Sequence, residues 1–144
     1  MNQEYDFSKF LQAQEVDYAK ALKEIQNGRK ESHWIWYIFP QLKSLGRSHM
    51  ALHFGIRDLN EARAYLSHPV LNMRLREITT ALLMLPTNDP TSVMSYPDDL
   101  KLCSCMTLFM HATDDNEVFC SVIEKYFGGH ADPNTLAEMN KDII

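Results

Sequence analysis

The sequence lacks the short motifs that accompany several common chemistries. It has no glycine-rich phosphate loop, no His-Glu-x-x-His metal box and no Gly-x-Ser-x-Gly nucleophile elbow. No apolar run approaches the ~20 residues that a membrane-spanning helix needs, and the opening residues MNQEYDFSKF are too polar and acidic for a signal peptide. Repeats, low-complexity tracts and linkers are also missing. These absences predict a globular protein that carries no membrane segment.

Cysteine is scarce and odd in number. The three cysteines are Cys103, Cys105 and Cys120, and without a secretion signal an odd count indicates free thiols in a reducing compartment. We therefore expect a cytoplasmic protein. Helical spacing places Cys103 and Cys120 on apolar faces, where a free thiol behaves as a small hydrophobic group. The position of Cys105 stays open, and none of the three is predicted to be a nucleophile.

Positive charge is too sparse overall for a nucleic-acid-binding protein. The net charge is −5, whereas nucleic acids favour proteins with a basic face. The charge is nevertheless uneven, because residues 20–47 hold six cations and two anions, and residues 86–144 hold three cations and ten anions. A locally positive segment on an acidic protein suits a small anionic ligand better than a polymer.

Helical patterns dominate the chain. A length of 144 residues with 45% hydrophobic residues predicts a single domain, residues 1–144, with a core of its own. We predict an all-α fold, a compact bundle of about seven or eight short helices. The expected helices cover residues 15–27 ending at Gly28, residues 32–39, a segment after Ser48, a segment after the capping box Asp58/Glu61, a segment from His68-Pro69 to Pro86, the stretch NDPTSVM with Asp89 as cap, residues 98–111, residues 115–127 ending at Gly128-Gly129, and a segment from Asp132-Pro133.

The helix that begins at Pro69 is the clearest of these. Proline is favoured in the first turn of a helix, where its missing N–H would be unpaired in any case. Leu71, Leu75, Ile78 and Leu82 follow at spacings of 4, 3 and 4 residues, which is the pattern of one buried helical stripe. This segment should therefore lie against the core.

The stretch ESHWIWYIFPQL, residues 31–42, is unusually aromatic. Trp34, Trp36, Tyr37 and Phe39 occupy four of six positions, and such residues favour strands. Because no other segment offers a partner strand, we interpret residues 32–39 as a short central helix, apolar on all sides. Two alternatives stay open: both tryptophans are plain core, or Trp36 faces a pocket while Trp34 packs inside.

The helix over residues 98–111 carries an unusual polar stripe. At 100° per residue, Ser104, Thr107 and His111 share one face, with Lys101 at its margin. A solvated face usually carries more Glu and Lys than Ser and Thr. The stripe is therefore either a solvent-exposed face or the wall of a ligand site, and the sequence leaves both readings open.

The segment LGRSHM, residues 45–50, could bind an anion. Gly46 permits a tight turn, Ser48 can cap the following helix, and Arg47 adds positive charge beside free backbone N–H groups. An ordinary capped helix start explains the same residues. His49 and His53 are spaced so that two imidazoles could meet one metal, but no third ligand is evident nearby. We therefore predict neither a metal nor a cofactor.

Several motifs together resemble a known family. GRKESHWIWYIFPQL, LGRSHMALHFGI, EARAYLSHPVLNMRL, DDLKLCSCMTLF and YFGGHADPNTL are similar, in register and over nearly the whole chain, to domain-of-unknown-function family eighteen-ten. The resemblance implies a small, all-helical, cytoplasmic and mainly bacterial protein with no established activity. Members often carry the label calpastatin, which nothing in this sequence supports. The family's motif residues fall here on Gly28, Arg29, Ser32, His33, Trp34, Trp36, Phe39, Pro40, Gln41, Gly46, Ser48, Tyr65, Leu66, His68, Pro69, Lys101, Ser104, Met106, Thr107, Phe109 and Asp132.

The leading functional hypothesis is a pocket for a small anionic ligand, a nucleotide or an ADP-ribose-like molecule, with hydrolytic or transfer chemistry as a further possibility. In this hypothesis Trp36 stacks on a ring, and His33 is the catalytic acid or base because its ordinary pKa lies near neutrality. The ligand-binding residues are Arg29, Trp36, Gln41, Gly46, Arg47, Ser48, Lys101, Ser104 and Thr107. Arg29 and Arg47 would pair with phosphate, and Gln41 and Ser104 would bond a sugar or base edge.

The alternative is a protein-interaction or regulatory module without chemistry. It predicts an exposed apolar patch and no concave polar pocket. Neither hypothesis involves nucleic acid or a membrane, and the sequence indicates no particular protein partner. Convergence of Arg29, Gln41, Arg47, Lys101 and Ser104 in space would favour the pocket.

Overall fold

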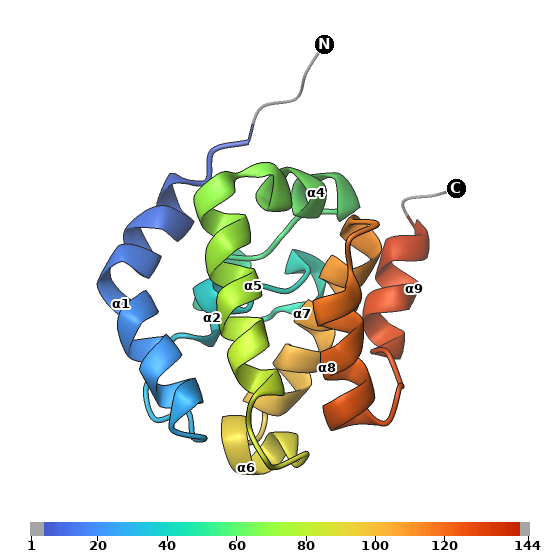
Figure 1. Ribbon diagram of the computed structural model, residues 1–144. Coiled ribbons are helices and arrows are strands. Elements are labelled where there is room, and N and C mark those ends of the chain that lie inside the picture. Colours follow the sequence, from blue (N-terminus) through green and yellow to red (C-terminus); the bar gives the residue numbers. More distant parts are fainter. Residues whose placement is uncertain (1–4, 142–144) are drawn as a thin grey trace.

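The computed structural model describes residues 5–141, and within that range the fold is all-α (Figure 1). These residues form nine α-helices and one 3-10 turn, and each of the nine expected segments overlaps one of the helices, of which α2, α3 and α6 have five residues or fewer. The elements are α1 (Ser8–Gln26), α2 (Ile35–Ile38), η1 (Lys43–Leu45), α3 (His49–His53), α4 (Leu59–Ser67), α5 (Pro69–Leu83), α6 (Pro90–Met94), α7 (Asp98–Ala112), α8 (Glu117–Phe127) and α9 (Pro133–Lys141).

Local capping signals set most of the helix boundaries. Asp58 accepts the N–H of Glu61 at the start of α4, and the ring of His68 accepts N–H groups at the start of α5. The four residues of the predicted α5 stripe are all buried, so both helices are confirmed. α1 begins at Ser8 and not at residue 15. The apolar pattern hid its first turns because a buried polar residue, Gln14, occupies a core-facing position there.

α7 is the central helix of the molecule. Ten of its fifteen residues are buried, and it contacts α4, α6, α8 and α9. α5 lies in front of it, between α1 and α8 (Figure 1). Residues from both the polar and the apolar face expected for α7, including Thr107 and Met106, are fully buried. The stripe of Ser104, Thr107 and His111, for which the sequence left open a solvated face or a ligand wall, is neither along its whole length, because Thr107 in its middle is enclosed.

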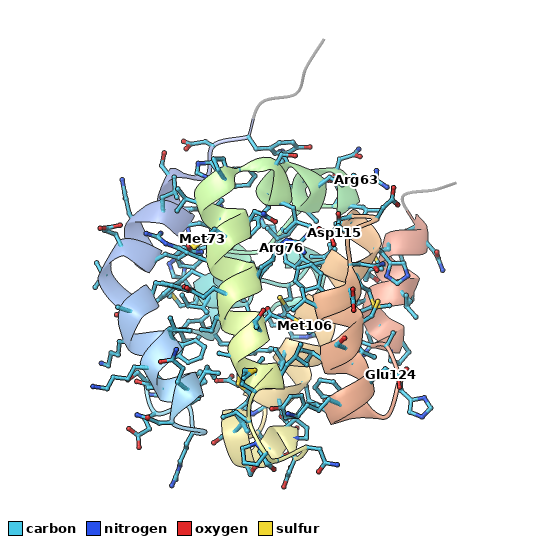
Figure 2. The ribbon with its side chains drawn as sticks, in the orientation of Figure 1. Arg63, Met73, Arg76, Met106, Asp115 and Glu124 are labelled. Carbon is cyan, nitrogen blue, oxygen red and sulfur yellow. The ribbon has the colours of Figure 1, made fainter. Side chains whose placement is uncertain are left out.

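The loop between α7 and α8 is fixed to α5 by a cation. Arg76 and Asp115 point toward each other (Figure 2), and the guanidinium donates to the Asp115 carbonyl over 2.9 Å. The same guanidinium lies 5.2 Å from the ring centre of Phe119. Arg76 thus joins α5 to the start of α8 by polar and by ring contacts.

The aromatic stretch forms a much shorter helix than expected. α2 contains only Ile35–Ile38, whereas residues 32–39 were predicted to be helical. Trp34 is 0% exposed and its Nε1 donates to the Glu24 carboxylate, while Trp36 is partly exposed. Of the two alternatives, plain core for both rings is wrong, because only Trp34 is fully enclosed. Helix formation before residue 35 is prevented because the backbone there bonds to Glu24 instead.

Glu24 organises the segment that precedes α2. Its carboxylate accepts the backbone N–H groups of Glu31 and Ser32, the Ser32 hydroxyl and the Trp34 indole N–H, over 2.7–3.0 Å. Burial acts to raise the pKa of Glu24, but the bonds from Ser32, Glu31 and Trp34 outweigh it and lower the pKa to about 2. A single buried carboxylate therefore fixes the chain from residue 31 to residue 34.

Candidate functional site

Three adjoining hollows lie where α2, the following loop, α7 and α9 meet. The inner hollow, of about 10 Å³, shares Gln41 and Lys101 with a main cleft of about 380 Å³. The main cleft in turn shares Leu45 and Asn134 with an outer hollow of about 560 Å³. The inner hollow is lined by Ile35, Trp36, Phe39, Gln41, Ala51, Phe54, Gly55 and Lys101, the main cleft by Gln41, Leu45, Pro97, Leu100, Lys101, Ser104, Asp132 and Asn134, and the outer hollow by Ser44, Leu45, Gly46, Arg47, Asn134, Ala137 and Glu138.

The loop that carries Gln41 is held by a short parallel pairing. Leu42 and Ile56 form an isolated bridge, in which Lys43 N donates to Ile56 O over 2.7 Å and Ile56 N donates to Gln41 O over 2.9 Å. Gly55 packs so closely on this loop that a Cβ there would lie 2.4 Å from the Cα of Lys43. The loop is therefore positioned by backbone contacts, which leave the Gln41 side chain at the junction of two hollows.

Lys101 and Trp36 form the centre of the site. Lys101 Nζ lies 5.6 Å from the centre of the Trp36 ring, within the range of a cation–π contact. The same ammonium lies 3.6 Å from Asp98, whose other oxygen is 2.8 Å from Lys30. The indole N–H of Trp36 is buried, and no described residue accepts it. A buried donor without an acceptor is rare in folded proteins and calls for a partner.

The floor of the main cleft is a bonded pair from α7 and the start of α9. Ser104 Oγ lies 3.2 Å from Asp132 Oδ2, and that oxygen also accepts the N–H and the hydroxyl of Thr135. The Thr107 hydroxyl accepts the backbone N–H of Asp132 over 2.8 Å. Asp132 therefore caps α9 and ties it to α7. Thr107 is 0% exposed, so its expected place on a ligand-facing wall is wrong.

The structure brings together six of the ten residues that the sequence singled out. Arg29 and His33, both exposed, lie outside the three hollows. His33 lines a separate hollow of about 270 Å³ with Lys30, Tyr96 and Asp98, which meets the main cleft at Pro97. Ser48 caps α3 by accepting Ala51 N–H over 3.1 Å, as predicted. The six that line the hollows are Trp36, Gln41, Gly46, Arg47, Lys101 and Ser104.

The sequence analysis did not assign Asp132 and Asn134 to the site, although both line the main cleft, nor the ion pair of Lys30 and Asp98 beside it. Lys30 has a side chain only 5% exposed, and its Nζ bonds Asp98 and lies 4.9 Å from the Trp34 ring. Lys30 and Asp98 each stand next to another charged residue in the sequence, which is typical of solvent-exposed positions. No local pattern therefore marks either residue as part of a buried ion pair. Asp132 carried a signal, because it precedes a proline at a helix start, but this signal indicated a cap and not a cleft.

Neither a metal cluster nor a membrane helix is found in residues 5–141. His49 and His53 stack with ring centres 6.2 Å apart. Across the described part of the chain, no group of three or more His, Cys, Asp or Glu side chains is arranged to hold a metal. Likewise, no helix among these residues is long and apolar enough to cross a bilayer.

The three thiols should differ sharply in reactivity. Cys105 is fully buried, and burial raises its pKa; burial and the nearby Asp132 raise the pKa of Cys103 to about 11. Cys120, expected on an apolar face, is partly exposed. A disulfide reagent at pH 8 should modify Cys120 first, because the thiolate is the reactive form, and all three thiols only in denaturant. Loss of the rapid phase in Cys120→Ser would support this assignment, and an unchanged rapid phase would contradict it.

Comparisons with known proteins agree with the fold. A family model described as a protein of unknown function (DUF1810) matches residues 4–139. The crystal structure of the conserved hypothetical protein Rv1873 from Mycobacterium tuberculosis is similar, with a TM-score of 0.93 and 43% sequence identity, covering 94% of this chain and 97% of that one. No curated protein matches the chain. The match over nearly the whole chain means that this protein belongs to the DUF1810 family.

Proposed function

We propose that the main cleft binds a small ligand that carries an oxyanion, with nucleotides and ADP-ribose-like molecules within the class. The observation that carries this proposal is the meeting of Lys101, Gln41 and Trp36, whose buried N–H has no acceptor among the described residues. A buried unpaired donor costs about 1–3 kcal/mol. An oxygen of a ligand, held beside the Lys101 ammonium, would remove that cost and neutralise a charge.

The size and lining of the cleft support a small molecule. A volume of about 380 Å³ falls within the range of roughly 300–1,000 Å³ typical of ligand sites. Leu45, Pro97 and Leu100 supply apolar surface, and Gln41, Ser104 and Asn134 supply neutral hydrogen-bonding groups. Arg47, in the outer hollow, could meet a second anionic group.

Trp36 and His33 have different roles in this proposal from those expected from the sequence. Lys101 already covers the ring of Trp36, and the hollow beside it, of about 10 Å³, has room for about one water-sized atom. A ligand ring would therefore pack against Pro97 and Leu100 and not on Trp36. His33 lies in a different hollow, so the proposal assigns it no acid or base role and concerns binding in the main cleft.

A protein-interaction module remains a second candidate because of exposed apolar residues between the main cleft and the neighbouring hollow of His33. Tyr96 is 74% exposed and Leu100 is 53% exposed, and Pro97 lies between them in sequence. Exposed apolar side chains that gather in a patch are typical of contact surfaces. This candidate predicts that small anions leave the stability of the protein unchanged.

Lys101→Gln should weaken binding of an anionic ligand about tenfold, because a charged hydrogen bond contributes about 1.5–3 kcal/mol and Lys101 is partly solvated. The measurement is a thermal-shift screen of inorganic phosphate, nucleotides, NAD derivatives and sugar phosphates, followed by dissociation constants for every compound that stabilises the protein. Lys23→Gln, on the exposed face of α1, makes the same charge change and should have no effect. Equal affinities in the two variants would remove Lys101 from the site.

A further inference from the structure

Asp132 offers a fixed hydrogen-bond acceptor in the main cleft, which adjoins the inner hollow that Trp36 lines. Its Oδ2 is held by Ser104 Oγ at 3.2 Å, by Thr135 N at 3.0 Å and by Thr135 Oγ1 at 2.5 Å. Its Oδ1 receives no hydrogen bond from any described residue, although Asp132 lines the cleft. The two Thr135 donors fix the orientation of the carboxylate, the Ser104 hydroxyl shares its single proton between this oxygen and Leu100 O at 3.2 Å each, and the other carboxylate oxygen is left available.

The positive and negative groups of the cleft are one helical turn apart. Lys101 and Ser104 are separated by three positions on α7, which places them on one face with a rise of about 4.5 Å between them. Asp132 is bonded to Ser104, so its carboxylate extends this row. A ligand that spans the row meets an ammonium at one end and a carboxylate at the other.

We infer that the ligand combines an oxyanion with hydroxyl groups, as a sugar or polyol phosphate does. This inference rests on the proposed function and narrows its ligand class. The oxyanion would lie at Lys101 and the buried Trp36 N–H, and a hydroxyl would donate to Asp132 Oδ1. A ligand with anionic groups at both ends would place like charges together at Asp132, and an uncharged sugar would leave the ammonium groups of Lys30 and Lys101 sharing the single carboxylate of Asp98.

The neutral side chains around Asp132 fit the same class. Gln41 lies at the Lys101 end of the cleft and Asn134 lies at the Asp132 end. Amides both donate and accept, so they can bond hydroxyls in either orientation. Leu45 and Pro97 offer apolar surface to the carbon skeleton.

The two tryptophans supply a direct readout of this geometry. The chain has two indole N–H groups: that of Trp34 is bonded to Glu24, and that of Trp36 has no acceptor in the described part of the structure. In a ¹H–¹⁵N spectrum of the full-length protein, an oxygen that accepts from Trp36 should move one indole signal downfield. The Trp34 signal should stay in place, and Trp36→Phe assigns the two.

The experiment titrates the labelled protein with ribose 5-phosphate, inorganic phosphate and ribose. We expect ribose 5-phosphate to move the Trp36 signal and to bind about tenfold more tightly than phosphate, because only ribose 5-phosphate can donate a hydroxyl to the charged acceptor of Asp132. Ribose alone should bind more weakly than either. Equal affinities for phosphate and ribose 5-phosphate would overturn the hydroxyl inference and leave the proposed function standing. If none of the three compounds moved the Trp36 signal, and Lys101→Gln changed no affinity, the hydroxyl inference and the proposed function would both be wrong.

Asp132→Asn tests the role of the carboxylate itself. Asparagine is also a good N-cap, so the start of α9 should survive, with the amide NH₂ turned into the cleft. We expect the preference for ribose 5-phosphate over phosphate to fall several-fold, because an amide NH₂ replaces the charged acceptor, while the affinity for phosphate stays the same. Asp114→Asn, at an exposed position outside the three hollows, is the matched control because it makes the same chemical change, and it should change neither.

A second variant keeps the test valid if Asp132→Asn fails to fold. Asn134→Ala removes an exposed amide at the same end of the cleft and should weaken ribose 5-phosphate several-fold more than phosphate. If Asp132→Asn or Asn134→Ala kept the full preference of the wild type, the hydroxyl end of the ligand would not lie at Asp132, and the inference would be wrong.

Discussion

Glu24→Gln should lower the free energy of unfolding at pH 7 by about 3 kcal/mol. The carboxylate accepts four hydrogen bonds from residues 31–34, and the glutamine side chain turns one acceptor oxygen into a donor that faces other donors. The shift of the Glu24 pKa from 4.5 to about 2 corresponds to the same amount, since one pKa unit equals about 1.4 kcal/mol. Urea unfolding at pH 7 measures this change in the free energy of unfolding. Glu31→Gln, at a neighbouring exposed position, is the control.

The pH dependence identifies the cause of that loss. Because the pKa of Glu24 is lower in the folded protein than in the unfolded chain, the carboxylate stabilises the fold fully above pH 4.5 and loses its contribution as the pH falls toward 2. The stability difference between the wild type and Glu24→Gln should therefore shrink from about 3 kcal/mol at pH 7 toward zero near pH 2. A difference that stayed constant over this range would mean that glutamine disturbs the packing and not the charge.

Gly55→Ala should be the other strongly destabilising change, at about 3 kcal/mol, the upper end for overpacking. The added Cβ would lie 2.4 Å from Lys43 Cα, 2.5 Å from Lys43 Cβ and 2.8 Å from the Ala51 carbonyl oxygen. Two of these are backbone atoms, so no side-chain rotation relieves the overlap. The bridge between Leu42 and Ile56 would have to open, which moves Gln41 away from Lys101.

Gly28→Ala is the matched control for Gly55→Ala. Gly28 has a φ of +88° and open space around its Cα, so alanine there meets only backbone strain of about 1 kcal/mol. Equilibrium unfolding compares the two variants directly. If Gly55→Ala cost no more than Gly28→Ala, the loop would be adjusting freely, and its backbone contacts would not be what positions the cleft.

Helices with local end signals could be predicted from sequence, and features made by distant contacts could not. Asp58 and Pro69 mark helix starts through bonds within their own turn, so the pattern is complete in a few residues. Glu24 looks like a charged residue on the surface of a long helix. It is buried because residues 31–34 fold back onto it, a contact that no periodicity encodes.

The residues of the candidate site also fall into those that local spacing predicts and those that distant contacts position. Lys101 and Ser104 share a face by helical spacing, and the structure places both on the cleft. Arg29 and His33 were assigned to the site because they are near Trp36 in sequence, but the bonds to Glu24 turn their segment away from Trp36. Asp132 reaches the cleft from the far end of the chain, through its bonds to α7.

The burial of α7 has a consequence for the thermodynamics of any association at the cleft. The wall that bears Lys101 and Ser104 is the element enclosed by α4, α6, α8 and α9, and it needs no further ordering when a ligand arrives. The entropy lost on association then comes from the ligand and from a few rotamers, chiefly those of the Lys101 side chain, and not from the backbone of α7. A preorganised wall of this kind preserves more of each contact as net affinity.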